Sequence, residues 1–154
     1  VTEVLRMTDL AEDALRVNSS AMTRRQVKVV REFADTPTIV ADRHKILQIL
    51  INLIRNAQHA CNDSGRDDKQ ITVRIARAEG CVKLSVIDNG VGIPAENITR
   101  IFNHGFTTRE DGHGFGLHSG ALMAKEMGGS LSVFSEGKDR GATFTLELPV
   151  KTQN

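Results

Sequence analysis

The most constraining feature of this sequence is a broad apolar stripe near the middle of the chain, repeated at helical spacing over about five turns. Asp42 lies just before it, and aspartate caps helix N-termini by accepting hydrogen bonds from free backbone N–H groups. A stripe of this width has to be covered, so the helix is expected to pack against the core of the domain. The apolar residues of the stripe are Ile46, Leu47, Leu50, Ile51, Leu53, Ile54 and Ala57.

The segments on either side of this helix alternate between helical and strand patterns. The polar stretch 62–70 is expected to be a loop, and residues 102–116 are rich in glycine and poorly periodic. The order of elements predicts an α+β fold, a two-layer α/β sandwich with helices on one face of a mixed, mainly antiparallel sheet. Further helices are expected over 3–17, 94–101 and 117–127, and strands over 26–34, 38–41, 71–77, 81–88, 130–136 and 142–149.

Composition excludes several classes of function. A chain of 154 residues fits one domain that can bury a core. The net charge of +1 gives no electrostatic case for nucleic acid or an anionic membrane surface. No apolar run approaches the roughly 20 residues that cross a bilayer. Cys61 and Cys81 lie far apart without metal-type spacing, so they are expected to be reduced core residues of a cytosolic protein.

Glycine occupies three alternate positions, Gly112, Gly114 and Gly116, directly before a helical pattern that begins at Leu117. Glycine costs conformational entropy and packs no side chain, so two explanations compete. The segment is either a loose surface turn or backbone cleared to lie against an anion at a helix N-terminus. Free N–H groups and the helix dipole attract negative charge at such a terminus.

The central helix carries two amide side chains, Asn52 and Asn56, on one face because they are four residues apart. Apolar neighbours indicate that this face is at least partly buried, and a buried amide needs hydrogen-bond partners. One interpretation is that neighbouring backbone groups satisfy both amides. The other is that amide oxygens bind Mg²⁺ whose charge is balanced by phosphates, since Mg²⁺ takes few protein ligands in phosphate sites.

The stretch VIDNGVGIP ends a predicted strand with Asp88, and Gly90 and Gly92 follow at once. One interpretation is a plain turn, because Asp-Asn-Gly is strong turn chemistry. The other is an acceptor carboxylate at the strand end, facing a flat ligand that glycine allows to come close. Further on, Arg109 is either solvated or a counter-charge for a phosphate group.

These motifs in this order resemble the catalytic and ATP-binding domain of sensor histidine kinases, in the Bergerat-fold ATPase superfamily. The stretch NLIRNA is similar to the N box of that family, DNGVGI to its first glycine box, IFNHGFTT to its F box and GHGFGL to its second glycine box. GATFTLELP is similar to the closing strand. The resemblance covers about residues 26–150, and it favours the anion-site explanation for the alternate glycines.

The resemblance implies a role for each matching residue. Asn56 matches the Mg²⁺-binding asparagine and Asn52 supports metal and phosphates, so both are the catalytic candidates. Asp88 matches the aspartate that accepts a hydrogen bond from the adenine amino group, and residues 102–116 are expected to act as a mobile lid. The cofactors implied are ATP and Mg²⁺. The residues implied to bind ATP are Asn52, Asn56, His59, Asp88, Gly90, Gly92, Ile93, Thr107, Thr108, Arg109, Gly112, His113, Gly114, Phe115, Gly116 and Leu117.

Three positions depart from the family pattern. His59 lies where many of these kinases carry lysine, so one phosphate contact is expected to be weaker or pH-sensitive. His113 replaces a small or hydroxyl residue. Ala142 lies where relatives place a hydroxyl near the adenine, and it is expected to face the same side as Phe144 and Leu146.

The resemblance also indicates which reaction to expect. The chaperone, gyrase and mismatch-repair ATPases of the superfamily, and its anti-sigma serine kinases, carry a glutamate one turn before the metal asparagine, where it acts as a general base. This chain has Asn52 there, and an amide cannot take up a proton. The sequence therefore argues against water activation and for transfer of the γ-phosphoryl group to a nucleophile on another domain. None of the five histidines has the acidic neighbour expected beside a phosphoacceptor.

We therefore expect residues 1–20 to be the end of a linker from a histidine-bearing helical hairpin, and residues 21–154 to be the catalytic domain. The expected partners are that phosphoacceptor and dimerisation domain and, indirectly, a response regulator, with no nucleic acid and no membrane contact by this segment. The expected location is cytoplasmic, within a soluble or membrane-anchored parent protein. The alternative function is a nucleotide-binding regulatory module or a slow ATPase of the same fold.

Overall fold

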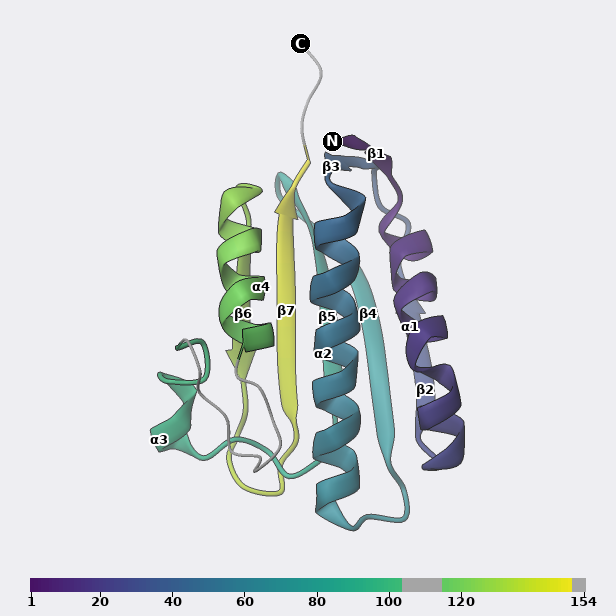
Figure 1. Ribbon diagram of the computed structural model, residues 1–154, viewed down its shortest axis with the longest axis vertical. Coiled ribbons are helices and arrows are strands. Elements are labelled where there is room, and N and C mark those ends of the chain that lie inside the picture. Colours follow the sequence, from purple (N-terminus) through teal and green to yellow (C-terminus); the bar gives the residue numbers. More distant parts are fainter. Residues whose placement is uncertain (104–114, 151–154) are drawn as a thin grey trace.

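The computed structural model describes residues 1–103 and 115–150 of the chain (Figure 1). Its helices are α1 (Met7–Arg24), α2 (Arg43–Ser64), α3 (Ala95–Ile98) and α4 (Phe115–Glu126). Its strands are β1 (Glu3–Leu5), β2 (Lys28–Phe33), β3 (Ile39–Ala41), β4 (Gln70–Ala78), β5 (Cys81–Asp88), β6 (Ser130–Phe134) and β7 (Ala142–Pro149).

Five of the strands form one sheet in the order β2-β4-β5-β7-β6. The β2–β4 pair is parallel, and the other three pairs are antiparallel. Figure 1 shows α1, α2 and α4 side by side over one face of this sheet, with α3 away from them at the lower left. The short strands β1 and β3 pair separately. The expected two-layer α+β architecture with a mixed, mainly antiparallel sheet is therefore confirmed.

The core lies between the three helices and the sheet. Every second residue of β5 and of β7 is buried on the side that faces the helices, as the period of a strand requires. The apolar stripe of α2 faces this layer, and the Asp42 carboxylate caps the helix by accepting from the backbone N–H of His44 (3.0 Å) and Lys45 (3.3 Å). The α2 residues that are almost fully buried are Ile46, Ile49, Leu50, Leu53, Ile54, Ala57 and Cys61.

The helix expected over residues 3–17 is wrong at both ends. Glu3–Leu5 pairs antiparallel with β3 as a short strand, and Leu5 is buried there. The helix then runs on to Arg24, because Asn18 and Met22 continue its buried face. A strand of three residues is too short for the spacing of apolar residues to separate it from one turn of helix.

Other boundaries differ by a turn or less. The loop expected from residue 62 begins at Gly65, which ends α2 in the left-handed region (φ +71°). Helix α3 ends at Ile98 rather than Ile101, and α4 begins two residues earlier than expected, at Phe115. The expected hairpin of β4 and β5, with its turn at Glu79-Gly80, is confirmed.

The first helix is part of the same core. It buries Met7, Leu10, Ala14 and Leu15, and it packs along α2. The interpretation of residues 1–20 as the end of a linker stays a prediction, and the structure adds that they contribute to the packing of this domain.

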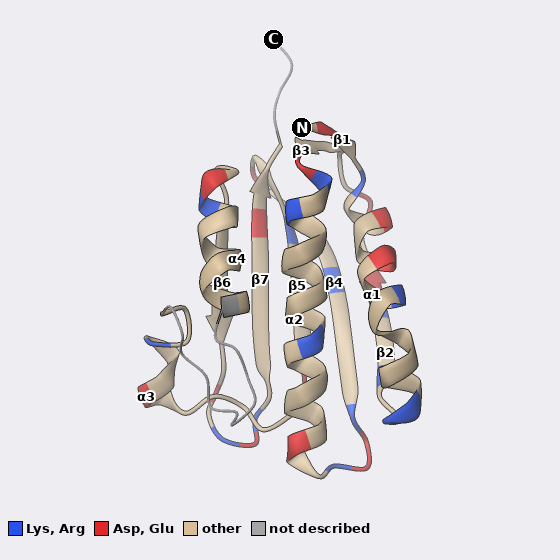
Figure 2. Ribbon diagram, in the orientation of Figure 1, with Lys and Arg blue, Asp and Glu red and all other residues tan. Residues whose placement is uncertain are grey.

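Charges of both signs are spread over the helices and loops in Figure 2 and form no large single-sign patch in that view. Glu12 of α1 pairs with Arg31 of β2 (2.5 Å), and Asp13 of α1 pairs with Arg43 of α2. At these partly exposed positions each pair contributes little to stability. In the described part of the chain, no helix combines the length and the apolarity that crossing a membrane requires.

The end of α1 contains a backbone conformation that the sequence does not indicate. Gln26 adopts φ +58°, in the left-handed region that glycine usually occupies after a helix. Its N–H donates to the carbonyl of Thr23 (3.1 Å), and the N–H of Val27 donates to the carbonyl of Met22 (2.9 Å). These two bonds form the Schellman motif, which closes the helix at the cost of strain at Gln26.

We predict that Gln26→Gly raises the free energy of unfolding by about 1 kcal/mol, because glycine removes the Cβ atom that disfavours positive φ. Urea denaturation measures the change. Gln26→Ala is the matched control, since it shortens the side chain but keeps the Cβ atom. Equal stability of the two variants would contradict strain at this position.

Candidate active site at the ends of β5 and α4

The proposed base-recognition residue lies at the last position of β5. Asp88 is only 6% exposed, and it pairs with Ala142 across the β5–β7 ladder. Its Oδ1 accepts a hydrogen bond from the backbone N–H of Gly90 (2.8 Å). Burial raises the pKa of this carboxyl to about 6, although the N–H groups of Gly90 and Ala142 favour the charged form. A carboxylate has about four lone-pair sites, so it can still accept from a ligand.

The turn that follows Asp88 is held by three separate elements. The side chain of Asn89 accepts from the N–H of Gln70, at the start of β4 (2.9 Å). The N–H of Val91 donates to the carbonyl of Ala60 in α2 (3.1 Å). The carbonyl of Gly90 accepts from the N–H of Gly141, just before β7 (3.2 Å). Hydrogen bonds to other parts of the protein therefore fix the conformation of this turn.

The glycines of this turn are required by close contacts within the protein. A Cβ atom on Gly90 would lie 2.4 Å from the carbonyl carbon of Ala60. On Gly92, which has φ +73°, a Cβ atom would lie 1.9 Å from the carbonyl oxygen of Gly137. The expected role of both glycines, to let an adenine base approach, stays a prediction. The close packing of the turn against Ala60 and Gly137 already explains why both positions are glycine.

Helix α2 also contacts the start of α4. A Cβ atom on Gly116 would lie 3.4 Å from the side-chain amide of Asn52, and one on Gly120 would lie 3.8 Å from Ile49. The N box and the end of the second glycine box, far apart in sequence, are therefore neighbours. Asn56 lies one turn beyond Asn52, half-buried on the same face of α2.

The other proposed site residues fall into two groups. Ile93 is half-buried against the core, and so is Leu117, in the first turn of α4. His59 is half-buried on α2, one turn after Asn56. Phe115 begins α4. Outside the described residues lie Thr107, Thr108, Arg109, Gly112, His113 and Gly114, and with them most of the proposed lid 102–116.

The first residue of the proposed lid, Phe102, is described by the structure and is anchored to the core. Phe102 packs edge-to-face on Phe144 of β7, with ring centroids 6.4 Å apart. The carbonyl of Phe102 lies 3.0 Å from Nδ1 of His118 in α4. The F box thus begins against β7 and α4. Ala142 is buried like Phe144, so its predicted direction is confirmed.

Sequence reasoning missed one part of the site, the β6–β7 loop of residues 135–141. Its Ser135 accepts a hydrogen bond from the N–H of Ile93 (3.0 Å). The N–H of Asp139 donates to the carbonyl of Val91 (2.6 Å). Gly137 and Gly141 indicate a turn here, but a turn pattern does not tell which other loop it contacts.

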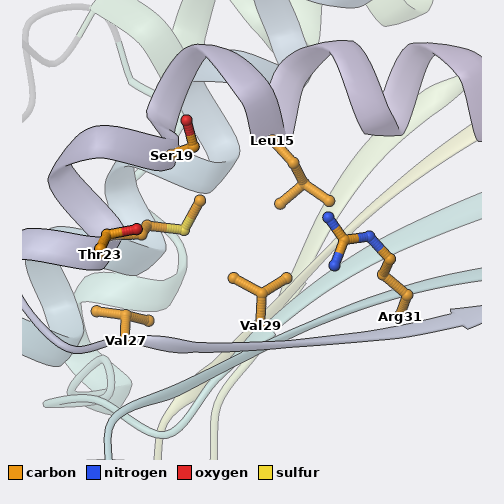
Figure 3. Close-up of a pocket in the computed structure, with 7 residues that line it drawn as sticks. Leu15, Ser19, Thr23, Val27, Val29 and Arg31 are labelled. Carbon is orange, nitrogen blue, oxygen red and sulfur yellow. The ribbon is translucent and has the colours of Figure 1, made fainter.

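Among the described residues, a pocket of about 250 Å³ lies between α1 and β2, away from the candidate active site (Figure 3). Figure 3 shows Arg31 reaching from β2 toward α1, where its guanidinium pairs with Glu12. None of the proposed site residues lines this pocket. Its lining residues are Leu15, Ser19, Met22, Thr23, Val27, Val29 and Arg31.

Among the described residues, no group of three His, Cys, Asp or Glu side chains is placed to hold a metal ion. The described residues offer a divalent cation amide oxygens such as that of Asn56, beside the phosphate oxygens of a ligand. That donor set suits Mg²⁺, which keeps few protein ligands beside phosphates.

Residues 41–152 match the family described as histidine kinase-, DNA gyrase B- and HSP90-like ATPases. Because the match covers more than half of the chain, the chain belongs to this ATPase family. The resemblance in the sequence motifs is thereby confirmed.

The relatives are sensor kinases. Sensor histidine kinase ZraS of Escherichia coli (strain K12) is 34% identical over 145 residues, which are 94% of this chain and 30% of that protein. The C4-dicarboxylate transport sensor protein DctS of Rhodobacter capsulatus is 32% identical over 147 residues, 95% of this chain and 22% of that protein. The chain thus spans less than a third of the length of either relative.

Solved structures agree in fold. The catalytic domain of histidine kinase ThkA superposes with a TM-score of 0.85 over 97% of both chains, at 25% identity. Full-length ShkA in complex with AMPPNP superposes with a TM-score of 0.86, at 26% identity, over 99% of this chain and 32% of the other. The domain therefore has the fold of histidine-kinase catalytic domains.

The buried carboxylate predicts a pH dependence of stability. The pKa of Asp88 rises from its ordinary value of 3.8 to about 6 on folding, so the folded state binds this proton more tightly than the unfolded state. Its contribution to stability is therefore greatest below pH 4 and is lost as the pH rises through 6. Across this pH range the contribution of Asp88 to the free energy of unfolding changes by about 3 kcal/mol.

Asp88→Asn should remove this dependence, since an amide does not titrate in this range. Relative to Asp88→Asn, the wild-type protein should lose stability between pH 4 and pH 7, as measured by urea denaturation in steps of pH. Asp35→Asn, at an exposed carboxylate, is the control. A pH-independent difference between wild type and Asp88→Asn would contradict the raised pKa.

Proposed function

We propose that this chain is the catalytic domain of a sensor histidine kinase, which binds Mg-ATP and transfers the γ-phosphoryl group to a histidine on a separate dimerisation domain. A response regulator would then receive the phosphoryl group from that histidine. The observation that carries the proposal is the amide of Asn52 beside Gly116 in the first turn of α4. Hydrolytic relatives have a general base at this position, and an amide cannot serve as one.

The base end of the site consists of Asp88, with Ile93 nearby. In its charged form Asp88 accepts a hydrogen bond from the exocyclic amino group of adenine. The apolar side chain of Ile93 packs near the ring. Guanine presents a carbonyl oxygen at the same position, so it would leave the carboxylate without a donor.

The phosphate end of the site consists of Asn52, Asn56 and the start of α4. Free N–H groups at the first turn of a helix favour anions, and the helix dipole adds to this preference. Asn56 would hold the Mg²⁺ ion with its side-chain oxygen, and Asn52 would support metal and phosphates. Bound Mg²⁺ supplies charge compensation at the transferring phosphoryl group. The protein contributes position and electrostatics, and the nucleophile comes from outside the domain.

We also propose that the domain works in the cytoplasm, where ATP is available. Support comes from the state of the cysteines, because Cys61 and Cys81 are both free and buried. Free thiols are typical of reducing compartments.

ATP should bind more tightly than GTP, by about tenfold or more, since a buried carboxylate facing a carbonyl oxygen costs about 1–3 kcal/mol. The preference should narrow at pH 5 relative to pH 8. Below a pKa of about 6 Asp88 carries a proton and can donate to guanine. Calorimetric titration of both nucleotides at the two pH values tests this. Equal affinities at pH 8 would remove Asp88 from the base site.

The isolated chain should bind Mg-ATP, fail to label itself, and hydrolyse ATP very slowly. Adding the parent's histidine hairpin should give acid-labile label on the hairpin. Asn56→Ala should abolish transfer by weakening Mg²⁺-dependent binding, and Asn62→Ala, on the same helix, serves as the control. Label on the chain alone, or brisk ATP turnover, would contradict the proposal. Binding without label on the hairpin would favour a regulatory module.

A further inference from the structure

The β6–β7 loop, residues 135–141, packs against the turn that follows Asp88. Besides the hydrogen bonds to Val91 and Ile93, the loop approaches the turn without room for a side chain. A Cβ atom on Gly141 would lie 2.1 Å from the carbonyl oxygen of Asp88. The position of this turn therefore depends on the conformation of the β6–β7 loop.

Ser135 is the side chain that connects the loop to the turn. Its Oγ accepts from the N–H of Ile93 (3.0 Å) and from the N–H of Gly137 (3.2 Å), and it donates to the carbonyl of Gly141 (2.7 Å). A hydroxyl has one proton and two lone pairs. These three bonds use all of them, so the hydroxyl is fully engaged by the backbone. The carbonyl of Gly137, at 3.5 Å, is a more distant second acceptor for the same proton.

One of these bonds reaches the Asp88 carboxylate through a single peptide group. The carbonyl of Gly141 and the N–H of Ala142 belong to the same planar peptide. Ser135 donates to its carbonyl end. Ala142, which carries the N–H end, pairs with Asp88 across the β5–β7 ladder, where this N–H favours the charged form of the carboxylate. Hydrogen bonds in such a chain strengthen one another. Removal of the hydroxyl would therefore loosen the peptide that orients the carboxylate.

We propose that Ser135 is a positioning residue that sets the base selectivity of the site, by holding Ile93 on one side and the Gly141–Ala142 peptide on the other. The proposal rests on the assignment of Asp88 and Ile93 to the base site. Ser135 needs no contact with the nucleotide for this role. It acts on recognition of the base and leaves the phosphate end of the site unchanged.

The test compares Ser135→Ala with Ser135→Thr, which restores a hydroxyl, and with Ser132→Ala, at an exposed serine on the preceding strand β6. Calorimetry with this chain measures the affinities for Mg-ATP, Mg-GTP and base-free Mg-tripolyphosphate at pH 8. In Ser135→Ala we expect ATP to bind about three- to tenfold more weakly. The ATP:GTP ratio should fall, and the tripolyphosphate affinity should not change. Ser135→Thr and Ser132→Ala should both keep the wild-type ratio.

A second measurement follows the pH profile of ATP binding. Without the Ser135 hydroxyl, the Ala142 N–H stabilises the Asp88 carboxylate less well, so the midpoint of the profile should move to higher pH. If Ser135→Ala does not fold, Ser135→Cys replaces it, since a thiol of similar shape is a weaker hydrogen-bonding group.

An unchanged ATP:GTP ratio and pH midpoint, with only a lower unfolding temperature, would overturn the proposal and leave Ser135 a structural residue. If the wild-type protein has no ATP preference and Asp88→Asn changes nothing, the base site itself is wrong and both proposals fail. If Asp88→Asn abolishes the preference while Ser135→Ala keeps it, the base site stands and the role of Ser135 is refuted.

Discussion

The burial of one carboxylate at the end of β5 is the constraint on which the arrangement of the site depends. A charged Asp88 in the core would be costly without hydrogen-bond partners. The chain supplies them from its own backbone, with N–H groups of Gly90 and Ala142. To do so the backbone turns sharply after β5, and β7 begins opposite the strand end. The proposed recognition of a base and the shape of the turn therefore depend on the same burial.

Helix α2 connects the two ends of the site. Asn52 contacts the first turn of α4, and Ala60 accepts from the turn after Asp88. These residues are eight positions apart on one helix, a separation of about 12 Å along its axis. The apolar stripe of α2 anchors the helix in the core, so its polar face is held at a fixed distance from both motifs. This rigidity is what a transfer reaction based on positioning requires.

The predictions that succeeded rest on local signals. The stripe of α2 with its Asp42 cap, and the β4–β5 hairpin at Glu79-Gly80, can be recognised from residues close in sequence. The prediction failed at β1 because a strand of three residues is too short to show a repeat of apolar positions. The left-handed Gln26 was missed because this position usually holds glycine. The parallel pairing of β2 with β4 joins segments whose patterns do not specify partners.

For the site, sequence indicated Asp88 at a strand end and the asparagine pair on one helical face. It gave no sign that the β6–β7 loop contacts the turn after Asp88, because the hydrogen bond between Ile93 and Ser135 joins residues 42 positions apart. The ligand-facing role that sequence suggested for Gly92 stays a prediction, and the structure adds that a Cβ atom there would meet the carbonyl oxygen of Gly137. Tertiary contacts of this kind follow from the packing of two loops, and no motif within either loop encodes them.

The central claim is that the base end of the site is built by the protein before any nucleotide binds. Amide hydrogen exchange of the nucleotide-free protein, read residue by residue by NMR, tests it most directly. The account predicts that the amide protons of Val91 and Ile93 exchange slowly, close to those in the middle of β5, because their acceptors are Ala60 and Ser135. Exchange as fast as at the exposed Glu79-Gly80 turn, with protection only after nucleotide is added, would contradict it.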